Sequence, residues 1–542
     1  MKTGIILILI LLMAAVIRFY QLGLVPPSPD WDEAALGYNA YSVLKTGRDE
    51  YGTLLPVTLR SFDDYKPPLY MYLAIPGVYV FGLSVWSVRL PSAVMGVLAV
   101  WGTFILVREL FRTGKSGQQT QSEALPLLAA FLLAVSPWHV QFSRIAFEAN
   151  SGITLNIWML CLLLRARTKP VYFIPASVLA GMALYAYHSE RIFIPLILII
   201  YFLIFRREIR ESRKFITVSL ITGAAVVMPL MPVFFNSASW TRLRGTSSIA
   251  DRTALFSTSV NRLERDTATG NPWGRVFDNR RLVLARTLAA GYLSHFSLKW
   301  LFLTGDNQRH HAPDMGLLYL VELPFFLAGL YGLVRHAGKP GKFVILWLLL
   351  APVPAAPTSG VPHAIRTMVA LPAIQVATVF GILRFWKYLT GMSVLMKRIC
   401  AALLIMAAAA NGYYFLDMYF RHMSYEFAPY WQYGYEQAVK YAEMHKDEYA
   451  KIVVSTRLEQ SYMFFLFFTK YDPARYLASG GTASGGFAES RNRFDKYEFR
   501  PLDWPQTRDT RVLYIGSPDE IPDPGVIIRN PDGTAAIHIS GT

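Results

Sequence analysis

The feature that most limits how this chain can fold is a series of long apolar runs separated by short basic segments. The first run covers residues 5–17 and the last covers residues 399–416. A helix that crosses the hydrocarbon core of a bilayer needs ~20 mostly apolar residues. Of the 542 residues, 53% are hydrophobic and 17% are charged, whereas a soluble domain carries roughly a quarter charged residues. The sequence therefore predicts a membrane protein.

The apolar runs predict an all-α polytopic membrane protein with about eleven spanning helices. The predicted spans cover residues 5–17, 90–110, 125–137, 153–164, 171–187, 192–205, 215–235, 316–334, 343–356, 368–383 and 399–416. The first run could instead be a signal peptide. However, the segment "VIRFYQLGLVPPSPD" at its end has no convincing A-x-A-like cleavage site, which favours a retained anchor.

Basic residues in the short loops predict the orientation of these helices. Short cytoplasmic loops collect Lys and Arg, and a cytoplasmic N-terminus places five basic loops in a row on the cytoplasmic side. They contain Arg108, Arg112 and Lys115; Arg165, Arg167 and Lys169; Arg206, Arg207, Arg210, Arg213 and Lys214; Arg335, Lys339 and Lys342; and Arg384, Lys387, Lys397 and Arg398. We therefore expect a multi-pass protein of the cell (plasma or inner) membrane. The net charge of +16 then needs no nucleic acid partner.

The outer side is predicted to hold loops 18–89 and 236–315 and the C-terminal tail. The apolar segment 67–83 is interrupted by Pro76 and Gly77, and taking it as a span would invert every later loop. We therefore expect a helix at the outer membrane interface, a depth that suits its tyrosines, and a second interfacial helix at 33–45. The many arginines of loop 236–315 suit either a surface that binds headgroups or the steering of an anionic substrate.

The C-terminal tail has a different pattern. "AKIVVST" and "TRVLYIGS" are typical of buried strands, "PDGTAAIHI" of a turn followed by a strand, and "YGYEQAVKYAEMH" of an amphipathic helix. The sequence therefore predicts two domains. These are a membrane domain at 1–418 and a small soluble α/β domain at 419–542 on the extracytoplasmic side.

Acidic residues and a lysine lie in the first predicted outer loop. Asp30, Asp32 and Glu33 stand at the start of the predicted helix 33–45. Carboxylates at this place cap a helix and interact favourably with its dipole, but they also suit catalysis. Lys66 follows in "SFDDYKPPLYMYLAIP". Its ammonium group either snorkels from the interfacial helix or binds a phosphate as a compact point charge.

Other polar residues recur near the predicted outer ends of the spans. Asp63 and Asp64 precede Lys66 and could bind a divalent metal through oxygen. The remaining candidates are Arg144, His188, Arg191, His310, His311, His363 and Arg366. A single arginine at a helix end is usually an interfacial anchor, whereas several cations beside carboxylates favour an anionic ligand. The adjacent His310 and His311 lack the spacing of a zinc motif such as HExxH, so we expect no zinc site there.

These residue types suit the transfer of a sugar from a lipid-linked phosphate. A phosphate leaving group already carries negative charge, so cations that neutralise this charge stabilise its departure. The attacking hydroxyl needs a general base, and a single Asp is sufficient. Glycoside hydrolysis differs, because there two carboxyl groups share the work.

Five stretches of the sequence resemble the GT-C superfamily of integral-membrane glycosyltransferases. The nearest branch is that of protein O-mannosyltransferases and bacterial lipid A aminoarabinose transferases. The stretches are "DWDEAALGYNAYSVLKTG", "DDYKPPLYMYLAIPGVYVFGLSVWSVRLPSAVMG", "SPWHVQFSRIAFE", "LFLTGDNQRHHAPDMGLLYLVELPFFLAGL" and "PHAIRT". The resemblance covers roughly residues 1–420. It implies an inverting transfer from a polyprenyl-phosphate-linked sugar on the outer side to a protein, lipid or glycan acceptor.

The resemblance also implies roles for particular residues. Asp32 would be the catalytic base, supported by Glu33. The implied ligands of the donor phosphate are Lys66, Arg144, Arg191 and Arg366, and the further candidates for substrate binding are Asp30, Asp63, Asp64, Tyr65, His188, His310, His311 and His363. Relatives often carry His or Glu at the position of Tyr65, and Asp30 competes with Asp32 for the role of base. Members of this branch generally need no metal cofactor, although the Asp63–Asp64 pair leaves a divalent metal open.

Two other functions compete with an enzyme. A transporter or lipid flippase would carry charges in discontinuous helices within the membrane. A non-catalytic receptor would bind a partner through its outer tail. The predicted spans carry few central charges, and the polar candidates gather on one predicted side. This pattern favours an enzyme at the outer interface.

Overall fold

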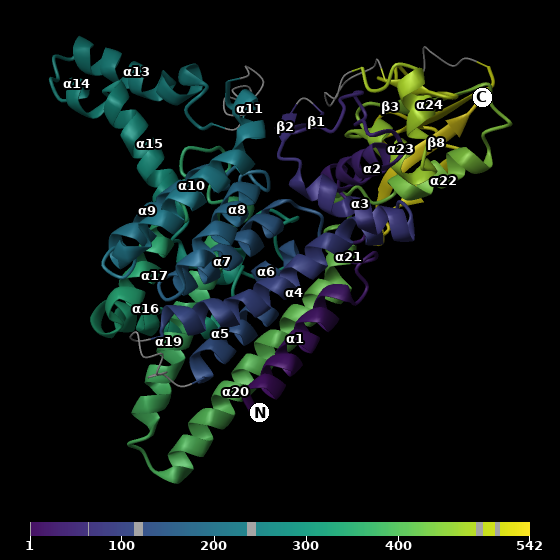
Figure 1. The fold of residues 1–542 in the computed structure, drawn as a ribbon. Helices are drawn as coiled ribbons and strands as arrows, with labels where there is room; N and C mark the ends of the chain where they lie inside the picture. The colour runs from purple at the N-terminus through teal and green to yellow at the C-terminus, as the bar shows by residue number, and fades with distance from the viewer. Residues whose placement is uncertain are drawn as a thin grey trace. The chain divides into compact units, whose positions relative to one another are not determined.

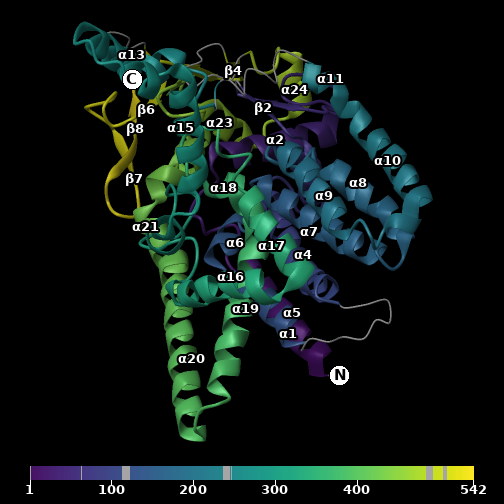
Figure 2. The ribbon, with the colours of Figure 1, turned by 90° about the vertical axis from the view of Figure 1, so that its left-hand side faces the viewer.

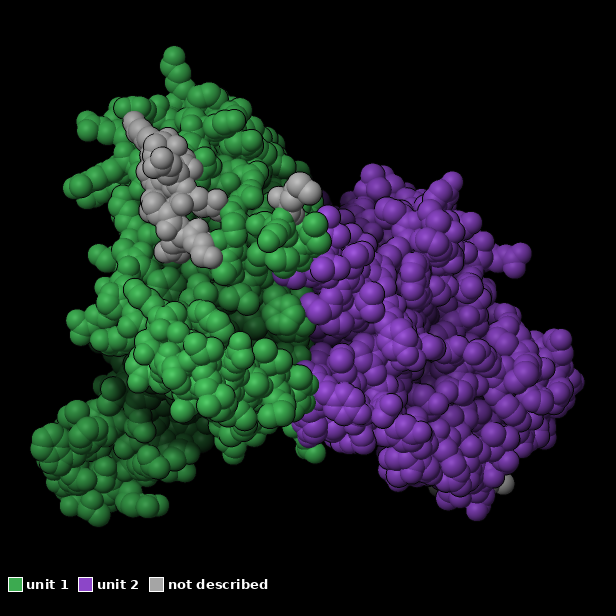
Figure 3. Space-filling view, turned by 90° about the horizontal axis from the view of Figure 1, so that it is seen from below, with its two compact units in different colours: residues 1–7, 99–139, 152–411 green, residues 8–98, 140–151, 412–542 purple. Residues whose placement is uncertain are grey.

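The computed structural model describes residues 2–62, 64–112, 123–235, 245, 247–483, 492–504 and 510–542. Its contacts divide the chain into two units, shown in different colours in Figure 3. Unit 1 comprises residues 1–7, 99–139 and 152–411, and unit 2 comprises residues 8–98, 140–151 and 412–542. Each unit therefore joins stretches that are distant in the sequence.

Helices build unit 1. Those that lie entirely within it are α5 (Ala124–Val135), α8 (Phe173–Ala183), α9 (Glu190–Phe205), α10 (Arg213–Val227), α11 (Met231–Phe235), α13 (Arg252–Ala268), α14 (Gly274–Phe277), α15 (Arg280–Ser294), α16 (Leu323–His336), α17 (Gly338–Leu350), α18 (Ala364–Thr367) and α19 (Leu371–Leu389). Helices that contribute residues to both units are α1 (Lys2–Phe19), α4 (Val85–Leu110), α6 (Pro137–Phe142), α7 (Ala149–Ala166) and α20 (Val394–Asp417). Helix α10 lies against α8 (Figures 1 and 2).

Close backbone approach explains how α16 packs on α19. A Cβ atom added to Gly329 would lie 1.7 Å from the carbonyl oxygen of Ala377, and one added to Gly381 would lie 1.9 Å from that of Phe325. Larger residues at these two positions would force the helices apart. Small residues serve the same purpose at many interfaces between membrane helices.

Six helical segments are long and apolar enough to cross a membrane, counted over the described residues. They are Lys2–Phe19, Val85–Leu110, Ala149–Ala166, Arg210–Val233, Ala364–Leu389 and Val394–Glu426. The other predicted spans contain helices as well, but these are shorter, such as Ala124–Val135 and Pro170–Ala183. The polytopic helical architecture is confirmed, and the number of about eleven spans stays a prediction.

A mixed sheet with helices forms the larger part of unit 2. Its helices are α2 (Trp31–Thr46), α3 (Leu69–Phe81), α21 (Met423–Glu426), α22 (Tyr435–Met444), α23 (Ser461–Thr469) and α24 (Pro473–Ala478). Its strands are β1 (Leu59–Ser61), β2 (Asp64–Lys66), β3 (Lys451–Ser455), β4 (Arg493–Phe494), β5 (Tyr497–Arg500), β6 (Val512–Gly516), β7 (Val526–Arg529) and β8 (Ala535–Gly541). Strands β1 and β2 form a separate hairpin, and the other six make one sheet in the order β4-β5-β3-β6-β8-β7.

The sequence patterns of the tail are confirmed in this sheet. The segments "AKIVVST" and "TRVLYIGS" contain β3 and β6, which pair in parallel at the centre, and "PDGTAAIHI" leads into β8. The five residues of β6 are all buried, as expected for a central strand covered on both faces. The predicted helix "YGYEQAVKYAEMH" is α22. The small α/β part that was predicted for the C-terminus is therefore present.

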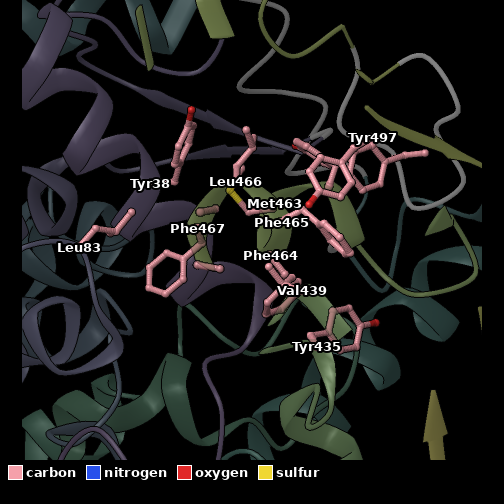
Figure 4. Close-up of a cluster of buried hydrophobic side chains, with 14 of the residues drawn as sticks. Tyr38, Leu83, Tyr435, Val439, Met463, Phe464, Phe465, Leu466, Phe467 and Tyr497 are labelled. Carbon is pink, nitrogen blue, oxygen red and sulfur yellow. The ribbon is translucent and has the colours of Figure 1, made fainter. Parts of the chain in front are cut away.

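Helix α2 shares a hydrophobic core with the C-terminal sheet (Figure 4). Tyr38 of α2 and Met463 of α23 are both fully buried in it. A Cβ atom added to Gly37 would lie 2.7 Å from a ring carbon of Phe467, so the absent side chain lets the two helices approach closely. This shared core groups residues 8–98 with residues 412–542, whereas the predicted domain division at residue 418 follows the order of the chain.

Two parts of the predicted outer loops contain structure that the sequence patterns did not indicate. Loop 236–315 contains α13, α14 and α15 (Figure 1). Helix α13 begins after Asp251, whose side chain accepts hydrogen bonds from the N–H groups of Thr253 and Ala254, and α15 begins after Asn279, which caps in a similar way. Loop 18–89 contains the hairpin β1–β2.

Candidate active site

The N-terminus of α2 carries a capping box. Oδ1 of Asp30 accepts hydrogen bonds from the N–H groups of Asp32 (2.8 Å) and Glu33 (3.1 Å). In return, Oε2 of Glu33 accepts one from the N–H of Asp30 at 3.2 Å. These bonds satisfy N–H groups that the first turn of a helix leaves without a helical partner. The cap fixes the backbone from which the side chain of Asp32 projects.

Glu33 is also held in a buried ion pair with Arg89 of α4. Nε of Arg89 donates to Oε1 and Nη2 donates to Oε2, both over 2.8 Å, and the exposed fractions of the two side chains are 0% and 1%. The N–H of Ala146 donates to Oε1 at 2.8 Å. Both oxygens of Glu33 are therefore occupied and shielded from solvent. Its contacts position the start of α2, since a bidentate pair fixes the geometry of both partners.

Arg89 also ties the segment before α2 to α4. Its Nη1 donates to the carbonyl oxygens of Leu22 (3.2 Å) and Pro26 (3.0 Å), and its Nη2 donates to that of Ser28 (2.8 Å). The planar guanidinium group presents its donors in a fixed arrangement. A single buried side chain thereby organises the segment that leads into the acidic residues.

The hairpin β1–β2 brings Lys66 to Asp32. Lys66 lies opposite Leu59 in the hairpin, and its ammonium group forms an ion pair with Oδ1 of Asp32. The exposed fractions of the two side chains are 7% and 31%. Asp30 and Glu33, in contrast, are buried. Of these three acids, Asp32 is therefore the one that solvent or a substrate can reach.

Several carboxylates act on the ammonium group of Lys66. Burial by itself lowers the pKa of Lys66, but the nearby charges of Asp32, Glu148 and Asp64 outweigh this effect, so that the pKa lies above its ordinary value. The lysine therefore stays positively charged at neutral pH. A compact cation in this place suits a phosphate group.

Arg144 lies in unit 2, fully buried. Its guanidinium group donates to the carbonyl oxygens of Ile17 (2.6 Å), Arg18 (3.0 Å), Gln21 (3.3 Å) and Val25 (3.0 Å). It also lies 4.7 Å from the ring centroid of Phe420. These contacts satisfy carbonyl groups at the end of α1 and in the segment after it. Arg144 thus has a structural set of partners, and its predicted role at the donor phosphate stays a prediction.

The structure describes only one of the two acids that precede Lys66. Asp64 lies opposite Ser61 in the hairpin, and its Oδ1 accepts a hydrogen bond from the N–H of Tyr65 at 2.8 Å. Asp63 lies outside the described residues. The metal site that the pair left open therefore stays untested.

The remaining candidates lie in unit 1. Arg191 donates from Nε to the carbonyl oxygen of Leu184 at 3.4 Å, and the ring of His188 lies against that of Tyr187. Arg366 donates from Nη1 to Oγ1 of Thr358 at 2.5 Å and to the carbonyl oxygen of Ser359 at 2.8 Å. These sets of contacts belong to one unit, whereas Lys66 and Asp32 belong to the other.

The histidine candidates of unit 1 gather around an acid that was not singled out in the sequence. Oδ2 of Asp306 lies 2.8 Å from Nδ1 of His310 and 3.9 Å from Nδ1 of His363. His311 lies beside them, but its Nδ1 is 2.6 Å from the carbonyl oxygen of Ala312. The structure therefore brings His310 and His363 together and turns this nitrogen of His311 toward the main chain.

Unit 1 also contains an apolar cavity of about 370 Å³. Its lining includes Trp138, His295, Trp300, Phe326, Leu348 and Ile374. Pockets that bury small apolar ligands have volumes of ~300–1,000 Å³. The cavity is therefore large enough for part of a lipid chain.

Comparison with known families and proteins points to glycosyltransferases. Residues 65–232, which begin next to Lys66, match the family described as dolichyl-phosphate-mannose-protein mannosyltransferase. The chain is also 26% identical over 184 residues to the YycA protein of Bacillus subtilis (strain 168), whose name proposes a mannosyltransferase. This match covers 33% of the chain and 24% of YycA, so the chain spans about a quarter of that relative's length.

Solved structures with a similar fold include those of two transferases. ArnT from Cupriavidus metallidurans bound to undecaprenyl phosphate matches with a TM-score of 0.56 and 13% identity over 100% of both chains. The apo oligosaccharyltransferase of Archaeoglobus fulgidus matches with a TM-score of 0.50 and 15% identity, over 86% of the chain and 63% of that protein. The chain has the GT-C fold. The GT-C fold predicted from the sequence is thereby confirmed.

Three residues of this GT-C chain have contacts that were not anticipated. Arg89 lies at the start of an apolar run, and a charge in such a run is a signal for a buried partner. Asp306 and His310 are four residues apart, the spacing at which side chains of one helical turn meet. The charge of Glu148 acts on Lys66 from a distant segment of the sequence, and no local pattern signals this interaction.

Proposed function

We propose that the chain is a membrane glycosyltransferase. It transfers a sugar from a polyprenyl-phosphate donor to a hydroxyl group of a protein, lipid or glycan acceptor, with inversion at the anomeric carbon. The GT-C fold supports this proposal, and so does the similarity to an ArnT structure that contains undecaprenyl phosphate. The observation that carries it is the ion pair of Lys66 with Asp32 at the N-terminus of α2.

Asp32 is the general base in this proposal. Asp30 is fully buried and accepts two hydrogen bonds as the helix cap, and Glu33 is saturated by Arg89 and the N–H of Ala146. A general base must come within hydrogen-bond distance of the proton that it accepts. Only the partly exposed Asp32 meets this condition among the three acids, so Asp30 and Glu33 act as its support.

Lys66 binds the donor phosphate and controls the base. Without a donor, its ammonium group neutralises the carboxylate of Asp32. A phosphate offers several oxygen acceptors and a negative charge, so it competes for this ammonium group. Binding of the donor then leaves the carboxylate of Asp32 free to accept a proton.

The transfer step uses these two groups. Asp32 accepts the proton of the acceptor hydroxyl while the hydroxyl oxygen attacks the anomeric carbon from the face opposite to the phosphate. The bond between this carbon and the phosphate oxygen breaks, and its electron pair leaves with the polyprenyl phosphate. Lys66 neutralises the charge on this leaving group. Asp32 afterwards releases its proton to solvent.

Unit 1 by itself also suits contact with lipid. The apolar cavity beside Trp138 and Trp300 suits isoprenoid units, because its lining exposes little polar surface. The proposal needs no phosphate contact from Arg191 or Arg366, whose predicted roles stay predictions.

A transfer assay tests this function. The full chain is purified, placed in lipid nanodiscs and supplied with a panel of polyprenyl-phosphate sugars and with envelope proteins, lipids and glycans as acceptors. Asp32→Asn should lower the transfer rate ~10²–10⁴-fold, the usual contribution of a general base, and should still bind undecaprenyl phosphate. Asp251→Asn makes the same chemical change at the cap of α13, where Asn caps equally well, and should keep the activity. Transfer by Asp32→Asn at the rate of this control would remove Asp32 as the base.

A further inference from the structure

Asp306, His310 and His363 of unit 1 form a compact group of metal-ligating side chains. One ligand atom from each lies within 4.8 Å of the others, and no second group of this kind occurs among the described residues. We propose that these three side chains bind one divalent transition-metal ion, with Zn²⁺ as the ion that fits best. Asp32 and Lys66, in contrast, belong to unit 2.

The distances between the ligand atoms suit a shared ion. Oδ2 of Asp306 lies 2.8 Å from Nδ1 of His310 and 3.9 Å from Nδ1 of His363. Bonds of ~2.0–2.2 Å to a tetrahedral Zn²⁺ place two ligand atoms ~3.4 Å apart. The two observed distances lie on either side of this value, so small side-chain rotations bring all three atoms to one ion.

Nδ1 of His363 is a buried atom that lacks a hydrogen-bond partner within the described parts of the chain. The side chain of His363 is 15% exposed, and its ring lies 5.0 Å from that of His310, centroid to centroid. A buried polar atom without a partner costs free energy. A metal ion bound to this nitrogen supplies the missing partner.

Neighbouring groups orient two of the ligands. The N–H of Ala364 donates to Oδ2 of Asp306 at 2.6 Å. The main-chain N–H of His363 donates to Nε2 of His295 at 3.1 Å, and Nδ1 of His295 lies 2.8 Å from the carbonyl oxygen of Gly291. Such outer contacts are typical of metal sites, since they fix the ligands before the ion binds.

The ligand set selects the class of ion. Two imidazole nitrogens and one carboxylate oxygen suit Zn²⁺ and its first-row neighbours, whereas Mg²⁺ and Ca²⁺ prefer sites made entirely of oxygen. Three protein ligands also leave at least one position of the ion open to water or to an oxygen of another molecule.

Metal binding by the purified full chain tests the proposal. The protein carries an affinity tag without histidines, is stripped with a chelator, incubated with Zn²⁺ alone, desalted and analysed for bound metal. We expect one tightly bound Zn²⁺ per chain. Asp306→Asn, His310→Ala and His363→Gln should each weaken Zn²⁺ binding by more than the ~10–100-fold that loss of an outer contact costs.

The neighbouring histidine provides the matched control. His311→Ala removes an imidazole from the same segment and should bind Zn²⁺ as the unchanged protein does. Thermal unfolding of each variant without metal checks the fold, and stabilisation by Zn²⁺ should appear only in the unchanged protein and in His311→Ala. Absence of stoichiometric Zn²⁺ from the unchanged protein, or equal binding by all variants, would overturn the site.

Discussion

Two buried acids near opposite ends of α2 are held in different ways. Glu33, in the first turn, meets the permanent cation Arg89 and the N–H groups of Asp30 and Ala146. Glu50, which follows the helix, is equally buried but meets neutral groups. It accepts hydrogen bonds from Asn39 (2.9 Å), Thr482 (2.6 Å) and Tyr462 (3.3 Å).

The difference has a physical consequence for each end of the helix. At the candidate active-site end, a cation that never loses its proton balances the buried carboxylate of Glu33. At the other end, burial raises the pKa of Glu50 to about 7, and the hydrogen bonds from Thr482 and Asn39 offset this only in part. A raised pKa favours the neutral, protonated form of Glu50, so we expect the attachment of α2 to the C-terminal sheet to depend on pH.

The largest effect is expected from breaking the ion pair at the active-site end. Arg89→Met leaves the carboxylate of Glu33 buried without its cation, which should lower the free energy of unfolding by ~3–5 kcal/mol. Chemical unfolding of the purified full chain measures this change. The double variant Arg89→Met/Glu33→Gln should recover part of the loss, because no unpaired charge remains. A loss below ~1 kcal/mol for the single variant would show that the pair is not the main support of this segment.

The second prediction is that the free energy of unfolding depends on pH through the carboxyl group of Glu50. The pKa of Glu50 is raised from 4.5 to about 7 in the folded chain, so between these values the folded state binds a proton that the unfolded state releases. Its contribution to stability is therefore complete below pH 4.5 and is lost as the pH rises through about 7. The loss amounts to about 3 kcal/mol. Unfolding measured at several pH values should show this slope in the unchanged protein and a flatter one in Glu50→Gln. Equal slopes would contradict the assignment.

The ion pair of Lys66 with Asp32 provides the third test. Its Asp32 side chain is 31% exposed, whereas Glu33 and Arg89 are both buried, so this pair should matter less for folding than Glu33 and Arg89 do. Lys66→Ala should instead weaken the binding of undecaprenyl phosphate by ~1.5–3 kcal/mol, the usual value of a hydrogen bond to a charged group. This corresponds to roughly 10–150-fold in affinity. Titration of the lipid phosphate in nanodiscs measures the change, and Lys45→Ala at the exposed end of α2 is the control. Unchanged affinity in Lys66→Ala would exclude the lysine from the phosphate site.

The sequence predicted those features that depend on local patterns. The helix expected at 33–45 is α2, and the apolar segment 67–83 contains α3. The segments "AKIVVST" and "TRVLYIGS", which are typical of buried strands, contain β3 and β6. Local patterns suffice here because each element buries a face that its own residues define. Helix α13 carries Phe256, Val260 and Leu263 at helical spacing. Helices α13 and α15 also begin at the capping residues Asp251 and Asn279, so both helices could have been predicted from the sequence.

The candidate site was predictable to a smaller extent. The acids before α2 were found because of their position at a helix start, and Lys66 because of its charge beside an apolar run. The partner of Glu33 is 56 residues away in the sequence, and Arg144 contacts α1 across 126 residues. Such pairings depend on how the elements pack, which no single segment encodes. The carbonyl partners of Arg144 could therefore not be foreseen from "SPWHVQFSRIAFE".

The smallest expected effect on stability comes from variants of Asp30, and it distinguishes Asp30 from Asp32 as the candidate base. Asp30→Ala removes the cap of α2 and should lower the free energy of unfolding by ~0.5–2 kcal/mol. Asp30→Ser keeps a capping oxygen, so it should lower the free energy of unfolding by roughly a few tenths of a kcal/mol at most. If Asp30 acts only as the cap, Asp30→Ser transfers sugar at nearly the rate of the unchanged protein, because the backbone that carries Asp32 keeps its position. If Asp30 were the base, Asp30→Ser would lose transfer while remaining as stable as the unchanged protein. Measuring stability and transfer on the same preparations distinguishes the two outcomes, since a cap acts through folding and a base acts through the reaction rate.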